Sequence, residues 1–182
     1  MFFERLAIPD VFTIRPKIIE DSRGYFCESF RIDLLEKFVA SKINFCQENQ
    51  SKSNYGVLRG LHFQLNPSAQ TKLVSVDYGK ILDVAVDLRS NSPTFGKHIS
   101  VEISDQNKLQ IFIPTGFAHG FIVLSKSATV SYKVDNYFNP DLERGILFND
   151  NNLNIDWKIP QKDIKISQKD LLNKKFVESE YF

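Results

Sequence analysis

Short segments in which apolar residues alternate with other residues fill the middle of this chain, and they restrict its fold more than any other feature. A period of two is typical of β-strands. Gly, Pro and Asn residues separate the segments, which predicts an antiparallel barrel or sandwich. We expect Tyr78-Gly79-Lys80 to join two of them as a tight hairpin. The clearest segments are 80–89, 99–103, 109–113 and 129–134, with Leu73, Val74 and Val76 before the first.

Helical patterning is confined to two places. An apolar stripe through Leu35 and Phe38 predicts a helix over Ile32–Ala40. The motif S-Q-K-D at 167–170 resembles a capping box that would begin a second, short helix. We expect both to lie at the ends of an all-β fold. With 182 residues the chain suits one domain, 1–182, and is too short for two.

The charge balance and the cysteine count exclude several classes of protein. Lys and Arg number 23 against 22 Asp and Glu, so there is no basic signature for nucleic acid or a membrane surface. No apolar run approaches the roughly twenty residues of a membrane span, and the N-terminal residues lack a signal-peptide pattern. Cys27 and Cys46 form neither a disulfide framework nor a metal-ligand spacing. We therefore expect a cytoplasmic protein with reduced thiols.

The run L-R-G-L-H-F-Q at 58–64 places Arg59 and His62 in an otherwise apolar segment. In a regular strand these side chains would point to opposite faces. A bulge or turn at Gly60 would bring both to one face. Lys72 follows in the apolar run K-L-V-S-V, where its ammonium should be partly desolvated. An Arg for phosphate, a His for proton transfer and a Lys for an oxyanion favour a catalytic site.

Only three histidines are present, and they limit the possible chemistry. His98 lies in a polar stretch and is expected at the surface. His119 lies in I-P-T-G-F-A-H-G-F, a turn between strands where it could also serve packing alone. His62 suits a general base or acid, and its structural alternative is a core histidine bonded to a backbone carbonyl. No H-x-H, H-x-x-x-H or nearby Cys pattern supports a metal, so we expect no metal site.

Each remaining candidate also has a structural interpretation. Lys72 could stabilise an oxyanion, or it could be an edge-strand lysine that prevents aggregation. Tyr132 could donate a proton or simply fill the barrel. Arg23 precedes Phe26 and Glu28, which share a strand face that suits a nucleobase as well as an ordinary amphipathic strand.

Taken together, these segments resemble one family, the dTDP-4-dehydrorhamnose 3,5-epimerases, which are metal-independent members of the cupin (jelly-roll) group. The resemblance implies an antiparallel jelly-roll barrel with a few short peripheral helices. It covers nearly the whole chain through ordered motifs, among them R-G-Y-F-C-E-S-F (23–30), Q-E-N-Q-S-K-S (47–53), V-L-R-G-L-H-F-Q (57–64), A-Q-T-K-L-V (69–74), I-L-D-V-A-V-D-L-R (81–89), S-P-T-F-G (92–96), I-P-T-G-F-A-H-G-F (113–121) and S-Q-K-D (167–170).

The resemblance implies 3,5-epimerisation of a nucleotide-linked 4-keto-6-deoxy hexose. The conversion would run from dTDP-4-dehydro-6-deoxy-D-glucose to dTDP-4-dehydro-L-rhamnose, a precursor of L-rhamnose in surface polysaccharide. The ketone acidifies the hydrogens on carbons 3 and 5. A base removes one, the charge moves onto the ketone oxygen, and an acid returns a proton to the opposite face. No redox step occurs, so no cofactor is expected.

The family pattern also implies roles for individual residues. His62 would be the base in a dyad with Asp170, Lys72 would stabilise the enolate, and Tyr132 would be the acid. Asp83 stands where family members carry an Asp and should face the interior. The substrate would contact Arg59 and His119 at sugar or diphosphate oxygens, Gln47 and Asn49 at the nucleotide, and Lys169 at the diphosphate. Arg23, Phe26 and Glu28 would come from the partner subunit of a homodimer and hold the base.

One position departs from the family pattern. Phe138 stands where many members have a second Tyr, so it can stack on a base but cannot donate a hydrogen bond. The sequence leaves open a mono-epimerase for carbon 3 or carbon 5, or another nucleotide sugar. A 3,4-ketoisomerase should lack the pairing of Tyr132 with Lys72. A non-catalytic sugar-nucleotide-binding jelly roll is the remaining alternative.

Overall fold

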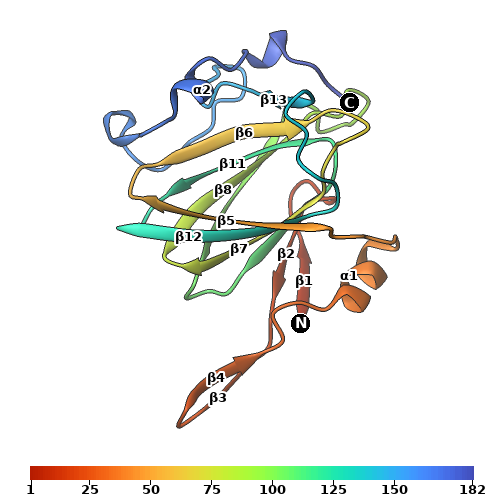
Figure 1. The fold of residues 1–182 in the computed structure, drawn as a ribbon, viewed down its shortest axis with the longest axis vertical. Helices are drawn as coiled ribbons and strands as arrows, with labels where there is room; N and C mark the ends of the chain where they lie inside the picture. Colours follow the sequence, from red (N-terminus) through yellow and green to blue (C-terminus); the bar gives the residue numbers. More distant parts are fainter.

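Two antiparallel sheets face each other in the computed structural model, which describes residues 1–182 (Figure 1). The six-stranded sheet has the order β1 (Phe2–Arg5), β2 (Phe12–Arg15), β10 (Gln110–Ile113), β7 (Lys72–Tyr78), β12 (Ser127–Val134) and β5 (Gln47–Asn54). The five-stranded sheet has the order β13 (Glu143–Gly145), β6 (Leu58–Gln64), β11 (Phe117–Val123), β8 (Lys80–Asp87) and β9 (His98–Ser104). This is the expected all-β jelly roll.

Aliphatic side chains from both sheets fill the space between them. Val74 on β7 and Val130 on β12 pack in one buried cluster with Ile81 and Ala85 on β8. These residues stand at alternate positions of their strands, so the period of two in the sequence does select the inner face. The same rule places polar side chains such as Asp83 inside, where the site is built.

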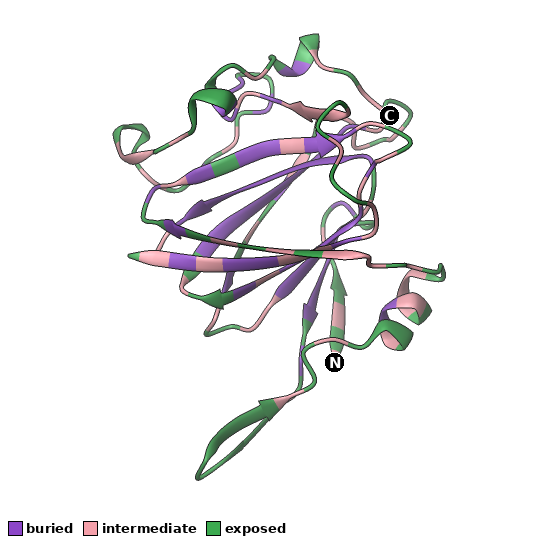
Figure 2. Ribbon diagram, viewed as in Figure 1, coloured by how far each residue is buried: buried purple, intermediate pink, exposed green.

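The outer face of the five-stranded sheet is buried as well. Leu82, Val84 and Val86 point away from the sandwich and pack under Trp157 and Phe176 of the C-terminal segment. In Figure 2, β8 and β11 are therefore buried along their length. A strand that is covered on both faces has no solvent-facing side, which explains why five of the six residues from Ile81 to Val86 are apolar.

The expected hairpin across Tyr78-Gly79-Lys80 is wrong. β7 and β8 lie in different sheets, and the turn carries the chain from one sheet to the other. Gly79 has a φ of +82°, and a Cβ there would lie 2.1 Å from the carbonyl oxygen of Ser127. Alternation identifies a strand but does not identify its hydrogen-bonding neighbour.

Helices and a hairpin complete the fold around the sheets. Helix α1 (Ile32–Val39) begins where the stripe predicts and packs Leu35 on the outer face of the six-stranded sheet. Helix α2 (Gln168–Leu171) is capped by the Ser167 hydroxyl, which accepts the Asp170 N–H, as the capping motif predicts. Single 3₁₀ turns span Gln161–Asp163 and Phe176–Glu178. Neither α-helix has the length or the apolar run that a membrane crossing requires.

Strands β3 (Ile18–Asp21) and β4 (Gly24–Cys27) pair only with each other. They form an arm that projects from the barrel at the end opposite the C-terminal segment (Figure 1). Nearly all of the arm is exposed (Figure 2).

Candidate active site

A bulge in β6 brings Arg59 and His62 to one face. Against β11, His62 lies opposite His119 and Arg59 lies opposite Phe121. Two residues of β6 thus face a single residue of β11 between these pairs, which reverses the alternation. Gly60 occupies the bulge with a φ of +128°, and a Cβ there would lie 2.5 Å from the Cα of Gly120. The predicted bulge at Gly60 is confirmed.

The bulge opens onto a cavity of about 570 Å³ between the two sheets. A smaller cavity of about 250 Å³ shares His62, Lys72 and Tyr132 with it and adds Gln47, Asn49, Phe138 and Glu143. A larger cleft of about 760 Å³ lies beside the arm, where Tyr25 and Cys27 face the outer surface of the six-stranded sheet, and it contains none of the catalytic candidates. The larger of the two joined cavities is lined by Arg59, His62, Lys72, His119, Tyr132 and Asp170.

His62 and Asp170 form a hydrogen-bonded pair across 108 residues of sequence. His62 Nε2 lies 2.6 Å from Asp170 Oδ1, and the carboxylate is buried. Burial alone would raise the pKa of Asp170, but the hydrogen bond and charge of His62, together with hydrogen bonding by the Ser167 side chain, lower it below its usual value. Because an ionised carboxylate can only accept, His62 Nε2 carries the proton. In the neutral form of the imidazole this tautomer leaves the Nδ1 lone pair free.

Lys72 lies in the same interior, next to Asp83. Burial lowers the pKa of Lys72 to about 8, against the negative charges of Asp83 and Glu143, which raise it. Asp83 is fully buried, as predicted, and its Oδ2 lies 2.8 Å from His119 Nε2. The expected desolvation of the lysine is confirmed. The arrangement provides a poorly solvated positive charge that a developing oxyanion could use.

Tyr132 faces the cavity from the sheet opposite to His62. Its strand β12 belongs to the six-stranded sheet, whereas β6 belongs to the five-stranded sheet. Burial raises the pKa of Tyr132, while the positive charge of Arg59 lowers it in part. The phenol is therefore protonated at neutral pH. A flat ligand held between the sheets would have His62 on one side and Tyr132 on the other.

Polar side chains expected to bind the substrate surround these groups. Arg59 Nε donates to the Ser53 hydroxyl at 3.0 Å. The Gln47 amide donates to Asn49 Oδ1 at 2.8 Å, and the Phe138 N–H donates to Gln47 Oε1 at 3.3 Å. Phe138 is half exposed at the edge of the smaller cavity.

Lys169 and Glu143 form an ion pair at the site. Lys169 lines the larger cavity and Glu143 the smaller one, so the pair joins α2 to β13 between the two cavities. Nothing in the motif E-R-G at 143–145 predicts a role for this glutamate. It enters the site because β13 pairs with β6 directly beside His62.

The structure does not bring Arg23, Phe26 and Glu28 to the cavity of their own chain. Arg23 lies at the tip of the arm and pairs with Asp21, and the Phe26 side chain is 65% exposed. Glu28 forms an ion pair with Arg31 just beyond the arm. His98 is half-buried at the start of β9 and lines neither cavity. No group of three or more His, Cys, Asp or Glu side chains is clustered as metal ligands.

Comparison with known proteins places this geometry in a family. A family model described as dTDP-4-dehydrorhamnose 3,5-epimerase matches residues 5–178. The dTDP-4-dehydrorhamnose 3,5-epimerase of Shigella flexneri is 50% identical over 178 residues, which cover 98% of this chain and 97% of that protein. The crystal structure of the Elizabethkingia anophelis enzyme superposes with a TM-score of 0.96 at 48% identity, covering 100% of this chain and 99% of the other. The dTDP-6-deoxy-D-glucose-3,5-epimerase of Legionella pneumophila, solved with dTDP-4-keto-L-rhamnose, gives a TM-score of 0.91 at 44% identity over 96% of this chain and 92% of its own.

Proposed function

The chain belongs to the dTDP-4-dehydrorhamnose 3,5-epimerase family and is an isomerase, and from this premise we propose that it inverts carbons 3 and 5 of dTDP-4-dehydro-6-deoxy-D-glucose. The product is dTDP-4-dehydro-L-rhamnose, a precursor of L-rhamnose for surface polysaccharide. One observation carries the proposal. The His62–Asp170 pair and the Tyr132 phenol face one cavity from opposite sheets, with the buried Lys72 beside them.

His62 acts as the base. Its Nδ1 takes a proton from the carbon next to the ketone, and Asp170 stabilises the imidazolium that forms. The electron pair of the broken C–H bond moves onto the ketone oxygen. Lys72 stabilises that enolate oxygen through its ammonium. His62 then releases its proton to water and the acid regains one from water, after which the step is repeated at the second carbon; no cofactor is required.

Tyr132 acts as the acid. Inversion requires a proton from the face opposite to the one that lost it, and Tyr132 approaches from the opposite sheet. Its raised pKa keeps the phenol protonated until the enolate forms. The phenolate is then close to the positive charge of Arg59, which favours it.

The nucleotide portion occupies the remaining polar walls. Arg59 and His119 hold sugar and diphosphate oxygens, because an Arg fork suits phosphate geometry. Gln47 and Asn49 bind the nucleotide, Phe138 stacks on the base, and Lys169 reaches the diphosphate. The residues that line the two cavities support this division. Arg59 and Lys169 line the larger cavity, and Gln47 and Phe138 line the smaller one.

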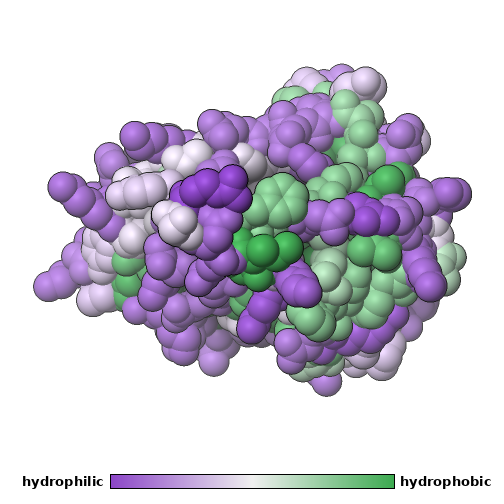
Figure 3. Space-filling view, turned by 90° about the horizontal axis from the view of Figure 1, so that it is seen from below, coloured by the Kyte–Doolittle hydropathy of each residue, from purple (hydrophilic) through white to green (hydrophobic).

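The active form is a homodimer in which Arg23, Phe26 and Glu28 of one chain hold the base in the site of its partner. Support comes from the arm, which lies far from its own cavity and exposes Ile19, Tyr25 and Phe26. Apolar side chains lie among the polar ones on the face seen from the arm's end of the molecule (Figure 3). Isolated two-stranded hairpins are marginal in water, so a partner subunit would stabilise this one.

Solvent exchange tests the proposal. Turnover in deuterated water should place deuterium on both carbon 3 and carbon 5 of the product. Exchange at one carbon alone would instead establish a mono-epimerase. His62→Asn and Tyr132→Phe should each abolish turnover and leave nucleotide binding nearly unchanged. A wild-type protein that binds dTDP-sugar but never exchanges deuterium would be a binding module.

A further inference from the structure

The Ser51 hydroxyl is a buried polar group of the cavity wall that has no hydrogen-bond partner. Four buried side-chain atoms in the chain lack a partner: Ser51 Oγ, Asp83 Oδ1, Gln110 Oε1 and Asn173 Nδ2. Of these four, only Ser51 lines the cavity of about 570 Å³ that holds His62 and Tyr132. A buried hydroxyl without a hydrogen-bond partner lowers the stability of the unliganded protein. The presence of a serine at this position therefore needs a reason other than stability.

The neighbours of Ser51 on β5 and β12 do not supply the missing partner. Val130 lies opposite Ser51 on β12 and is apolar. Ser53, the next residue on the inner face of β5, already accepts the Arg59 Nε–H through its hydroxyl. In the other direction along β5, Asn49 lies opposite Tyr132. Ser51 therefore stands between the proposed acid and the arginine proposed to hold phosphate.

We propose that Ser51 is a substrate-binding residue whose hydroxyl donates a hydrogen bond to a non-bridging oxygen of the phosphate that carries the sugar. The inference rests on the proposed function. An anionic oxygen held by Arg59 would lie next to Ser51, because Ser53 fixes that guanidinium one inner-face position further along β5. A hydroxyl that donates to an anionic oxygen makes a charge-assisted bond, which is stronger than a neutral one.

Ser51→Ala tests this assignment through two measurements on the purified full-length protein. Titration calorimetry with thymidine diphosphate should show an affinity roughly 10- to 100-fold weaker than that of the wild type. The unliganded variant should unfold at the same temperature or a higher one, because the lost hydroxyl had no partner. KM for the sugar nucleotide should rise while kcat stays nearly constant. Ser100→Ala, an exposed serine on β9, should change none of these quantities.

Three results would overturn the assignment. Unchanged affinity for thymidine diphosphate with unchanged KM would make Ser51 irrelevant to binding. Unchanged affinity with a raised KM would move the hydrogen bond from the phosphate to the sugar. A clear fall in the unfolding temperature of the unliganded variant would give Ser51 a structural role. Failure of the proposed function is separate, since a wild type that binds thymidine diphosphate without exchanging deuterium leaves the binding test of Ser51 intact.

Discussion

Because Lys72 is buried, its ammonium should lose its proton within the pH range of an ordinary activity assay. Its pKa is lowered to about 8 by burial, and only the ammonium form stabilises an enolate. As the pH rises through about 8, the charged fraction falls, so kcat should show a descending limb there. Lys72→Met should lower kcat by roughly 10²-fold or more. A variant that loses stability but keeps kcat would return Lys72 to a structural role.

A substitution at Asp83 tests whether the titration of Lys72 causes the descending limb of kcat. Its carboxylate raises the pKa of Lys72, so Asp83→Asn should move the descending limb of kcat to lower pH. Glu102→Gln removes a carboxylate from the exposed side of β9 and should leave the limb in place. An equal shift in both variants would mean that net charge sets the limb and that the neighbouring carboxylate does not.

Single residues of the site could be predicted where the sequence marks them by type. His62 and Lys72 are unusual residues in apolar strands, whereas Tyr132 is assigned to the site only through the family resemblance; the structure places all three on one cavity. Glu143 could not be predicted in this way, because its role follows from the pairing of β13 with β6, a strand far away in the sequence. Ser53 could have been found, since alternation puts it on the same face of β5 as Gln47 and Asn49.

At the scale of elements, the bulge of β6 should depend on the missing side chain of Gly60. Gly60→Ala combines a φ of +128° with a Cβ only 2.5 Å from the Gly120 Cα. We expect the free energy of unfolding to fall by roughly 2–4 kcal/mol and kcat to fall as Arg59 and His62 lose their common face. Urea unfolding and steady-state kinetics would measure both effects.

Gly24→Ala is the control that separates the effect of backbone strain from the effect of the close contact between Gly60 and Gly120. Gly24 has nearly the same φ, +124°, but no atom lies within 4 Å of the point that a Cβ would occupy, so only backbone strain of about 1–2 kcal/mol is expected. If both variants lose equal stability, the contact with Gly120 contributes nothing and does not hold the bulge in place.

The strands themselves could be predicted, but their partners could not. The apolar pattern located β8 and β12 correctly, because it depends only on which side chains of a strand are buried. The order of strands depends on contacts between distant segments, so Tyr78-Gly79-Lys80 was expected as a hairpin and is a crossover between sheets. The covering of β8 by Trp157 and Phe176 has the same long-range origin.

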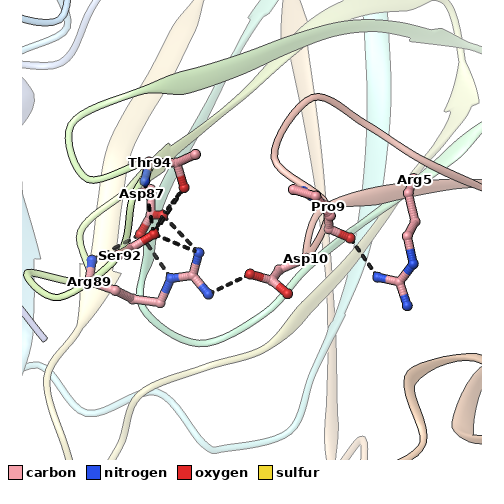
Figure 4. A network of polar contacts seen from close by, with 7 residues as sticks. All are labelled: Arg5, Pro9, Asp10, Asp87, Arg89, Ser92 and Thr94. Carbon is pink, nitrogen blue, oxygen red and sulfur yellow. Dashed lines mark hydrogen bonds and ion pairs between the residues drawn. The ribbon is translucent and has the colours of Figure 1, made fainter.

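At the scale of the whole molecule, Asp87 ties distant segments together (Figure 4). The buried carboxylate accepts hydrogen bonds from Arg89, Ser92 and Thr94, and Arg89 reaches Asp10 near the N-terminus. Burial would raise the pKa of Asp87, but these hydrogen bonds lower it to about 2. A lowered pKa stabilises the fold above the unfolded value near 3.8, and this stabilisation is lost as the pH falls toward 2.

Asp87→Asn should therefore lower the free energy of unfolding at pH 7 by roughly 2–3 kcal/mol. The difference from the wild type should shrink as the pH falls from about 4 toward 2, because the wild-type carboxylate is then protonated. Urea unfolding across this pH range would measure it. Asp156→Asn removes an exposed carboxylate paired with Lys158 and should cost less than about 1 kcal/mol. A constant difference at every pH would exclude the titration of Asp87 as the cause.

The proposed dimer predicts that two inactive variants can restore activity when they form a mixed dimer. If the arm serves the partner's site, a mixed dimer of Arg23→Ala and His62→Asn chains has one intact site, with His62 from the first chain and Arg23 from the second. Co-refolding equal amounts should then restore roughly a quarter of the wild-type rate, since half of the dimers are mixed and each has one working site. A mixture of His62→Asn with Tyr132→Phe should recover nothing, because both residues line the cavity of one chain. If the first mixture instead shows no more activity than the two variants measured separately and added, Arg23 does not act across an interface. The exposed arm would then need another explanation.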